Sequence, residues 1–203
     1  DPGDFENRFG HGDYYRLPGC PEPRLAAKRS AAGRCSLRFA SRLTEMTTFN
    51  DARVRRGNDR PTNPKGKYVL YWPQMFRRLH SNHALDYALH LCREWKKPLV
   101  VYEALKLNYP WAAARHHAFI LQGMRDNAAA ANTLGVTYWP FVETPDDAGH
   151  GLVRRIAGDA CAVVTDDYPA FNVPAHNRAL AAKADVPVFL IDGNSMVPLS
   201  KLG

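Results

Sequence analysis

The sequence of 203 residues contains no apolar run long enough to predict a membrane-spanning helix. It has only four cysteines, and no two of them have the spacing of a CxxC metal knuckle. Cys92 falls inside a helical pattern and Cys161 opens an apolar run, which is typical of small buried thiols. A disulfide framework is therefore not indicated, and a reducing cytoplasm is the expected location.

Common nucleotide-binding and nucleophile motifs are also missing. No G-x-G-x-x-G follows a strand-like run, and neither a Walker A sequence nor a G-x-S-x-G elbow is present. His116 and His117 are adjacent and point in different directions on a helix, while His80 and His83 have no nearby cluster of cysteines or carboxylates. The sequence therefore predicts neither a metal site nor a self-contained catalytic set.

The net charge of +7 is unevenly distributed along the chain. Residues 1–66 hold 13 Lys and Arg against 8 Asp and Glu, whereas residues 67–203 hold 14 against 12. A basic chain can indicate nucleic-acid binding, but most of this surplus lies outside the regularly patterned part. Charge alone therefore does not predict a DNA-binding surface.

Residues 1–66 show no sustained period and are rich in Gly, Pro, Arg and Ala, so we expect an irregular or disordered segment. The chain starts at Asp1 and its first methionine is Met46. One explanation is that residues 1–45 are upstream sequence that is not expressed. Alternatively, residues 24–43 contain no acidic residue and resemble an organelle transit peptide. Both explanations stay open.

Residues 67–203 alternate short apolar runs with helical patterns. The apolar runs cover 68–72, 98–105, 136–142, 161–166 and 186–192. The helical patterns cover about 82–95, 111–133, 149–158 and 173–184. Continuous apolar strands that alternate with helices indicate a parallel sheet covered on both faces. We therefore predict an α/β domain: a doubly wound, five-stranded parallel sheet with helices on both faces.

Polar residues gather where these strands end, and ligands of doubly wound sheets bind beyond the carboxyl ends of the strands. Asn82 also has the position of a helix N-cap. The candidate ligand-binding residues are Trp72, Gln74, Arg77, Arg78, Asn82, Glu103, Thr165, Asp166 and Asp167.

The order of these segments resembles the amino-terminal domain of the DNA photolyases and cryptochromes. The matching stretches are YVLYWPQMFRRLHSNHALDYAL, KPLVVYEAL, YPWAAARHHAFILQGM, VVTDDYPAF and VPVFLIDGNSMVPL. The last stretch resembles the exit from the final strand in the class II branch. Together they cover about residues 66–203.

This resemblance implies light-driven repair of cyclobutane pyrimidine dimers in damaged DNA, with FAD bound in a separate helical domain that would follow this one. It also implies no catalytic residue within this chain, a monomeric full-length protein and an antenna pigment, folate or deazaflavin, at the strand ends. Arg77 and Arg78 would then bind an anionic pigment tail, Asn82 would hydrogen-bond, and Asp166 would accept from a ring nitrogen.

Two other functions remain possible from the sequence. A cryptochrome-like photoreceptor would keep the fold and signal instead of repairing DNA. A stand-alone nucleotide-binding module of the universal-stress or electron-transfer-flavoprotein kind would also be α/β, although the missing glycine-rich loop argues against it.

Overall fold

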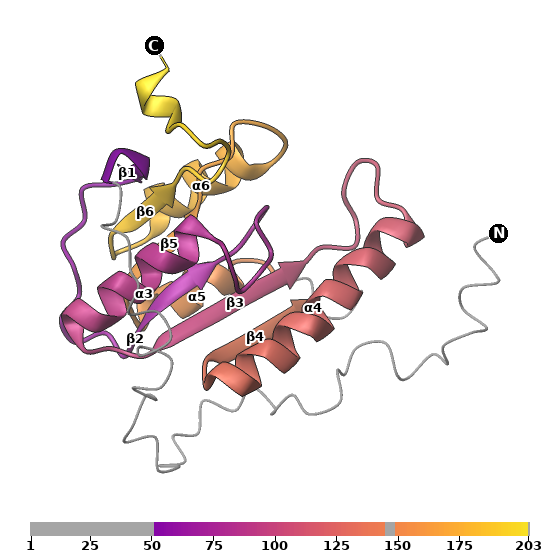
Figure 1. The fold of residues 1–203 in the computed structure, drawn as a ribbon, viewed down its shortest axis with the longest axis horizontal. Coiled ribbons are helices and arrows are strands. Elements are labelled where there is room, and N and C mark those ends of the chain that lie inside the picture. The colour runs from indigo at the N-terminus through magenta and orange to yellow at the C-terminus, as the bar shows by residue number, and fades with distance from the viewer. Residues whose placement is uncertain (1–50, 145–148, 203) are drawn as a thin grey trace.

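The structure, a computed structural model, describes residues 51–144 and 149–202 (Figure 1). The expectations for residues 1–45 lie outside this range. The described residues form a six-stranded sheet in the order β1-β6-β5-β2-β3-β4, with helices on both faces. The predicted α/β class is confirmed. No helix in the described ranges is both long enough and apolar enough to cross a bilayer.

All neighbouring strands of the sheet are parallel except β1, which runs antiparallel to β6. The strands are β1 (Val54–Arg56), β2 (Tyr68–Trp72), β3 (Leu99–Leu105), β4 (Thr137–Val142), β5 (Ala160–Asp166) and β6 (Val188–Ile191). Every residue of β5 and β6 is buried, because helices or loops cover both sides of the sheet there. This is why these strands read as continuous apolar runs.

The predicted count of five strands is wrong, because β1 adds a sixth at the edge. This strand lies within residues 1–66, for which we expected irregular structure. Arg55 and Arg56 are exposed, and Val54 is only half-buried, so the strand carries no apolar pattern. Its pairing with β6 rests on backbone hydrogen bonds, which any side chains allow, and exposed cations are usual on edge strands.

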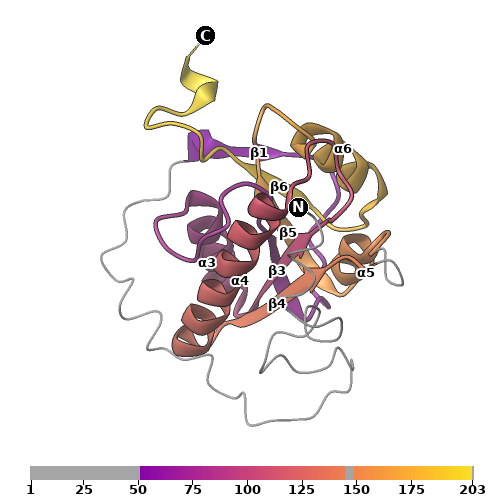
Figure 2. The same cartoon turned by 90° about the vertical axis from the view of Figure 1, so that its right-hand side faces the viewer.

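The helices form two layers, one on each face of the sheet (Figure 2). They are α3 (His83–Trp95), α4 (Ala114–Leu134), α5 (Leu152–Gly158) and α6 (Val173–Lys183), with two short 3-10 helices, η1 (Asp51–Arg53) and η2 (Leu199–Lys201). One core cluster packs under α3 and the second half of α4, and the other packs under α5 and α6. These positions match the predicted helical patterns to within three residues at either end.

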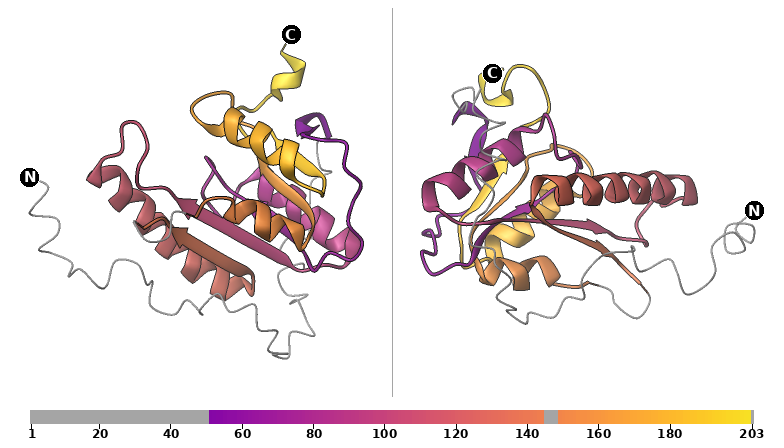
Figure 3. Two further views of the ribbon diagram at one scale, coloured as in Figure 1. Left: turned by 180° about the vertical axis from the view of Figure 1, so that it is seen from behind. Right: turned by 60° about the horizontal axis from the view of Figure 1, so that its bottom comes forward.

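The direction of winding reverses between β2 and β5, which are paired in the sheet. Figure 3 shows the whole ribbon from behind and with its bottom turned forward. From β2 the chain continues outward through β3 to β4, and from β5 it continues outward in the other direction to β6. Ligands of doubly wound sheets bind at such a reversal, beyond the carboxyl ends of the two strands. Here Trp72 ends β2 opposite Thr165 of β5.

The chain that leaves β6 turns around Asp192. Its Oδ1 accepts the backbone N–H of Asn194, and its Oδ2 accepts that of Leu199. Arg53, which is buried, donates to the Asp192 carbonyl at 3.1 Å and to that of Met196 at 2.7 Å. Residues of η1 thereby hold the segment that follows the last strand.

Asp192 gives a testable pH dependence. Burial acts to raise its pKa, but the N–H donors of Leu199 and Asn194 and the charge of Arg53 outweigh burial, so the pKa lies below the ordinary 3.8. A depressed carboxyl pKa contributes stability that is fully present above 3.8 and is lost as the pH falls through the lower folded-state value. In the Asp192→Asn variant the free energy of unfolding should depend less on pH in that acid range than in the wild type. Urea titrations at several pH values measure this dependence. An unchanged slope would contradict this role.

Candidate functional site

Asp166, at the end of β5, fixes the loop that follows β2. Its Oδ2 accepts three consecutive backbone N–H groups, from Gln74 at 2.8 Å, Met75 at 2.7 Å and Phe76 at 3.0 Å. The residue is fully buried, and burial raises the pKa of its carboxyl although these three donors oppose the shift. The two strands at the reversal point are therefore joined by this carboxylate.

Gln74 connects that loop to α6. Its Nε2 donates to Thr165 Oγ1 at 3.0 Å and to Asn177 Oδ1 at 2.7 Å, and its Oε1 lies 3.1 Å from Nδ1 of His176. Thr165 is itself fully buried and donates to the Trp72 carbonyl at 2.7 Å. The His176 ring stacks on Trp72 with 6.1 Å between centroids. Three of the candidate residues, Trp72, Gln74 and Thr165, thus meet in one network.

Glu103, on β3, is the centre of a second network and is only 1% exposed. Its Oε2 accepts from Tyr138 Oη at 2.7 Å and from Asn127 Nδ2 at 2.9 Å, and its Oε1 lies 3.4 Å from Nη1 of Arg77. Burial and then the Glu103 carboxylate raise the pKa of Tyr138 well above the usual 10.0, so this phenol stays a donor. Arg77 also donates to the carbonyl of Ala104, which holds the loop after β2 against β3.

Asn82 is the N-cap of α3, as predicted. Its Oδ1 accepts the N–H groups of Ala84 and Leu85. Its Nδ2 donates to Tyr71 Oη and to the carbonyls of Phe76 and Arg78 at 2.8 to 3.0 Å. The whole amide is therefore occupied by the protein itself.

The last two candidates lie nearer the surface. Arg78 is exposed, donates to the carbonyl of Ser81, and places its guanidinium 5.8 Å from the Phe76 ring centroid. Asp167 makes a two-point ion pair with Arg55 of β1, with both distances 3.0 Å. Its carboxylate therefore bonds to the edge strand β1 rather than to the residues around Asp166 and Glu103.

The structure adds buried residues that strand-end reasoning missed. Asn127 and Asn177 lie on α4 and α6, and each joins a helix to one of the networks. A signal was present, because Asn177 shares the buried helical face of Val173 and Leu180. A buried polar side chain on an apolar helix face needs a partner.

An antenna pigment can be tested against these contacts. Arg77, Asn82 and Glu103 are committed to the protein's own hydrogen bonds, so they offer a pigment little. Asp166 Oδ1, by contrast, is buried and accepts no hydrogen bond from the described residues. This acceptor has the chemistry to pair with an N–H donor of a ring system, but the residues that bury it would have to move to admit a ring.

Three aromatic rings lie in the loops that follow β2 and β5, next to Asp166. The Tyr168 ring meets Phe76 edge-on with centroids 6.2 Å apart and stacks on Phe171 at 6.4 Å. Such rings suit a flat conjugated ligand. A surface pocket of about 500 Å³ lies elsewhere, along α5, and none of the candidate residues lines it.

Comparison with known proteins gives one strong sequence match. The chain is 33% identical over 148 residues to a deoxyribodipyrimidine photo-lyase of Methanothermobacter thermautotrophicus, covering 72% of this chain and 32% of that protein. The matched part thus spans about a third of the relative's length. No family model matches the chain.

Matches to solved structures are weaker. A universal stress protein from Archaeoglobus fulgidus is 17% identical over 62% of this chain and 94% of its own, with a TM-score of 0.41. A universal stress protein from Pseudomonas aeruginosa is 12% identical over 64% and 49%, with a TM-score of 0.43. These values carry no conclusion about function. The sequence match, by contrast, supports the photolyase family for this chain.

Proposed function

We propose that this chain is the α/β portion of a light-dependent cyclobutane pyrimidine dimer photolyase of the class II kind. The observation that carries the proposal is the 33% identity to a photolyase across 72% of the chain. The match leaves about two thirds of the relative uncovered, which suits a protein whose FAD-binding part lies outside this chain. Damaged DNA would bind mainly to that other part, in a monomeric cytoplasmic enzyme.

Within that enzyme the α/β portion would position an antenna pigment. A bound folate or deazaflavin supplies light absorption, and the energy passes through space, so the protein's task is to place the ring. Asp166 Oδ1 would accept a hydrogen bond from an N–H group of the pigment. The side-chain rings of Phe76 and Phe171 would contact the flat face of the pigment. The exposed guanidinium of Arg78 would bind an anionic tail. Arg77 would act on the pigment only through the loop that it holds.

The experiment is a repair assay on a photolyase-length protein that contains this chain. With the flavin reduced, it should remove thymine dimers from an oligonucleotide under blue or near-ultraviolet light and leave them intact in the dark. The 203-residue chain by itself should repair nothing. Flavin binding without any light-dependent loss of dimers would refute the repair function and favour a cryptochrome-like photoreceptor.

A further inference from the structure

The segment that leaves β6 lies directly against the loop that follows β2. We call residues 192–201 the exit segment. At its second residue, Gly193, an added Cβ would lie 2.8 Å from Cε2 and 3.0 Å from Cδ2 of the Phe76 ring. The ring can lie this close to the backbone because glycine has no side chain. The Phe76 ring therefore rests on the exit segment.

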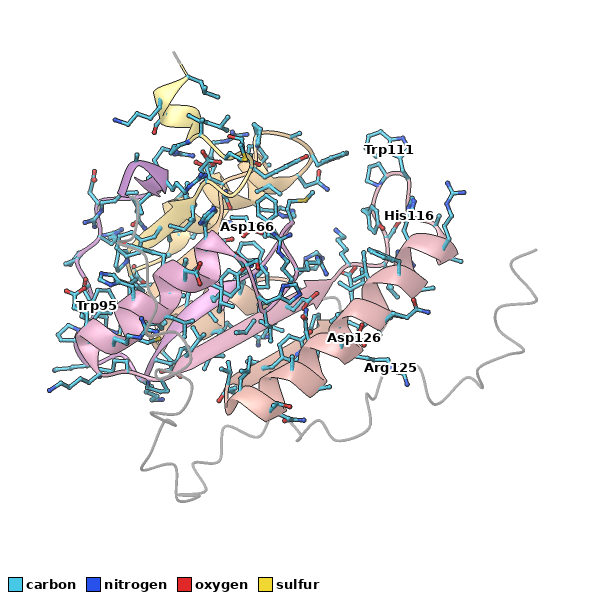
Figure 4. The ribbon with its side chains drawn as sticks, in the orientation of Figure 1. Trp95, Trp111, His116, Arg125, Asp126 and Asp166 are labelled. Carbon is cyan, nitrogen blue, oxygen red and sulfur yellow. The ribbon has the colours of Figure 1, made fainter. Side chains whose placement is uncertain are left out.

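Phe76 links the exit segment to the strand ends. Its backbone N–H donates to Asp166 Oδ2 at 3.0 Å, and its ring meets that of Tyr168 edge-on. Asp166, the last residue of β5, is paired with Ile191, the last residue of β6. Figure 4 shows Asp166 at the edge of the sheet from which the exit segment, in yellow, leaves. The exit segment thus begins beside the residues that we assign to the pigment.

A second contact joins the exit segment to the loop after β5. Asn194 Nδ2 donates to the Asp167 carbonyl at 2.8 Å and to Asp192 Oδ1 at 2.8 Å. The Asp167 N–H in turn donates to the Ile191 carbonyl at 2.8 Å. Two consecutive residues, Gly193 and Asn194, therefore contact the two loops that flank the reversal point.

Arg53 fixes the shape of the exit segment. Its side chain donates to the carbonyls of Asp192 and Met196, which are four residues apart, and its own carbonyl accepts the Asp192 N–H at 2.9 Å. The residue is only 6% exposed, and a buried guanidinium is costly unless its donors are paired. One rigid, planar group that bonds to both carbonyls closes the chain between them into a fixed turn.

We propose that Gly193 and Arg53 are positioning residues of the strand-end site, and the inference rests on the proposed function in taking the ligand to be the antenna pigment. Gly193 sets the place of the Phe76 ring. Arg53 acts one step further away, by fixing the exit segment that carries Gly193. Both residues act on the pigment through Phe76 and not by contact.

Gly193→Ala tests the first step. The added methyl group would come within 3.0 Å of the Phe76 ring, so this side chain has to rotate away. The aromatic NMR signals of Phe76 in the 203-residue chain should therefore shift. In a photolyase-length protein that contains this chain, affinity for a reduced folate or a 5-deazaflavin, each titrated separately, should fall by about tenfold.

Gly123→Ala is the matched control for this variant. An added Cβ at Gly123 meets no atom within 4 Å. Gly123 lies on α4 two residues before Arg125, which Figure 4 shows well apart from Asp166. The control should leave the Phe76 signals and the affinity for both probes unchanged.

Arg53→Ala and Arg53→Lys test the second step by amide hydrogen exchange. Alanine removes both donors, so the amides of Asn194 and Leu199 should exchange faster and the affinity for the pigment probes should fall. Lysine keeps the charge with one nitrogen in place of two, so it should restore part of both. The Val163 amide, which bonds to the Pro187 carbonyl within the sheet, should change little in either variant. If Arg53→Ala does not fold, Arg53→Lys is compared with the wild type.

Three results would overturn the proposal. Unshifted Phe76 signals in Gly193→Ala would show that the exit segment does not set the place of the ring. A shifted ring with unchanged affinity would show that Phe76 does not position the pigment. Equally fast exchange at Val163 and at Asn194 in the Arg53 variants would assign Arg53 to general stability.

The wild type separates this inference from the proposed function. A photolyase-length wild type that binds neither probe would refute the antenna role, and the inference with it. A wild type that binds a probe no more tightly than Gly193→Ala does would refute the inference alone.

Discussion

Glu103→Ala is expected to lower the free energy of unfolding by about 3–5 kcal/mol, the usual cost of breaking a buried ion pair by removing one partner. The carboxylate is 1% exposed and accepts from Tyr138, Asn127 and Arg77, so its removal leaves three donors without their acceptor. These donors lie on β4, on α4 and in the loop after β2. The loss therefore loosens three elements at once.

Urea titration of the wild type and the variant measures this effect. Glu94→Ala is the matched control, because Glu94 is an exposed carboxylate whose one ion pair with a described residue is to His90, one helical turn away. That change should cost less than about 1 kcal/mol, as surface pairs do. Similar losses for both variants would show that the network around Glu103 does not hold these elements together.

The inner strands of the sheet could be predicted from the sequence, because a strand that is buried on both faces consists of a continuous run of apolar residues. β5, for example, reads as a continuous apolar run, and all seven of its residues are buried. β1 could not be predicted in this way. Its three residues pair with β6 through the backbone, and two of their side chains are exposed arginines that contact Asp167 and the Phe189 ring, so no apolar periodicity marks the strand.

The candidate site was predicted in position more than in role. Parallel strands bring their carboxyl ends to one edge, so the convergence of Gln74, Thr165 and Asp166 followed from topology. Which group bonds to which depends on side-chain rotamers and on helices that pack later in the chain. Strand ends alone therefore could not show that Asn127 would bond to Glu103 or that Asn177 would bond to Gln74.

Asp166→Ala is expected to destabilise the protein by about 2–4 kcal/mol, because three N–H groups lose one shared acceptor at a cost of about 1–3 kcal/mol each. Burial raises the pKa of this carboxyl, which means that holding the charge in the interior has a cost. Removing the charge recovers that cost and offsets part of the loss. The three lost hydrogen bonds outweigh it because they fix consecutive residues of one loop.

Amide hydrogen exchange distinguishes this mechanism from a general loss of stability. In the variant, the amides of Gln74, Met75 and Phe76 should exchange faster than the rest of the sheet edge, since their acceptor is gone. Asp167→Ala is the matched control, because the carboxylate of Asp167 is next in the chain but pairs with Arg55 near the surface. Its removal should lower the free energy of unfolding by less than about 1 kcal/mol. If Asp166→Ala left those three amides as protected as in the control, the carboxylate would not be what fixes the loop, and the one unpaired oxygen offered to a pigment would lose its fixed position as well.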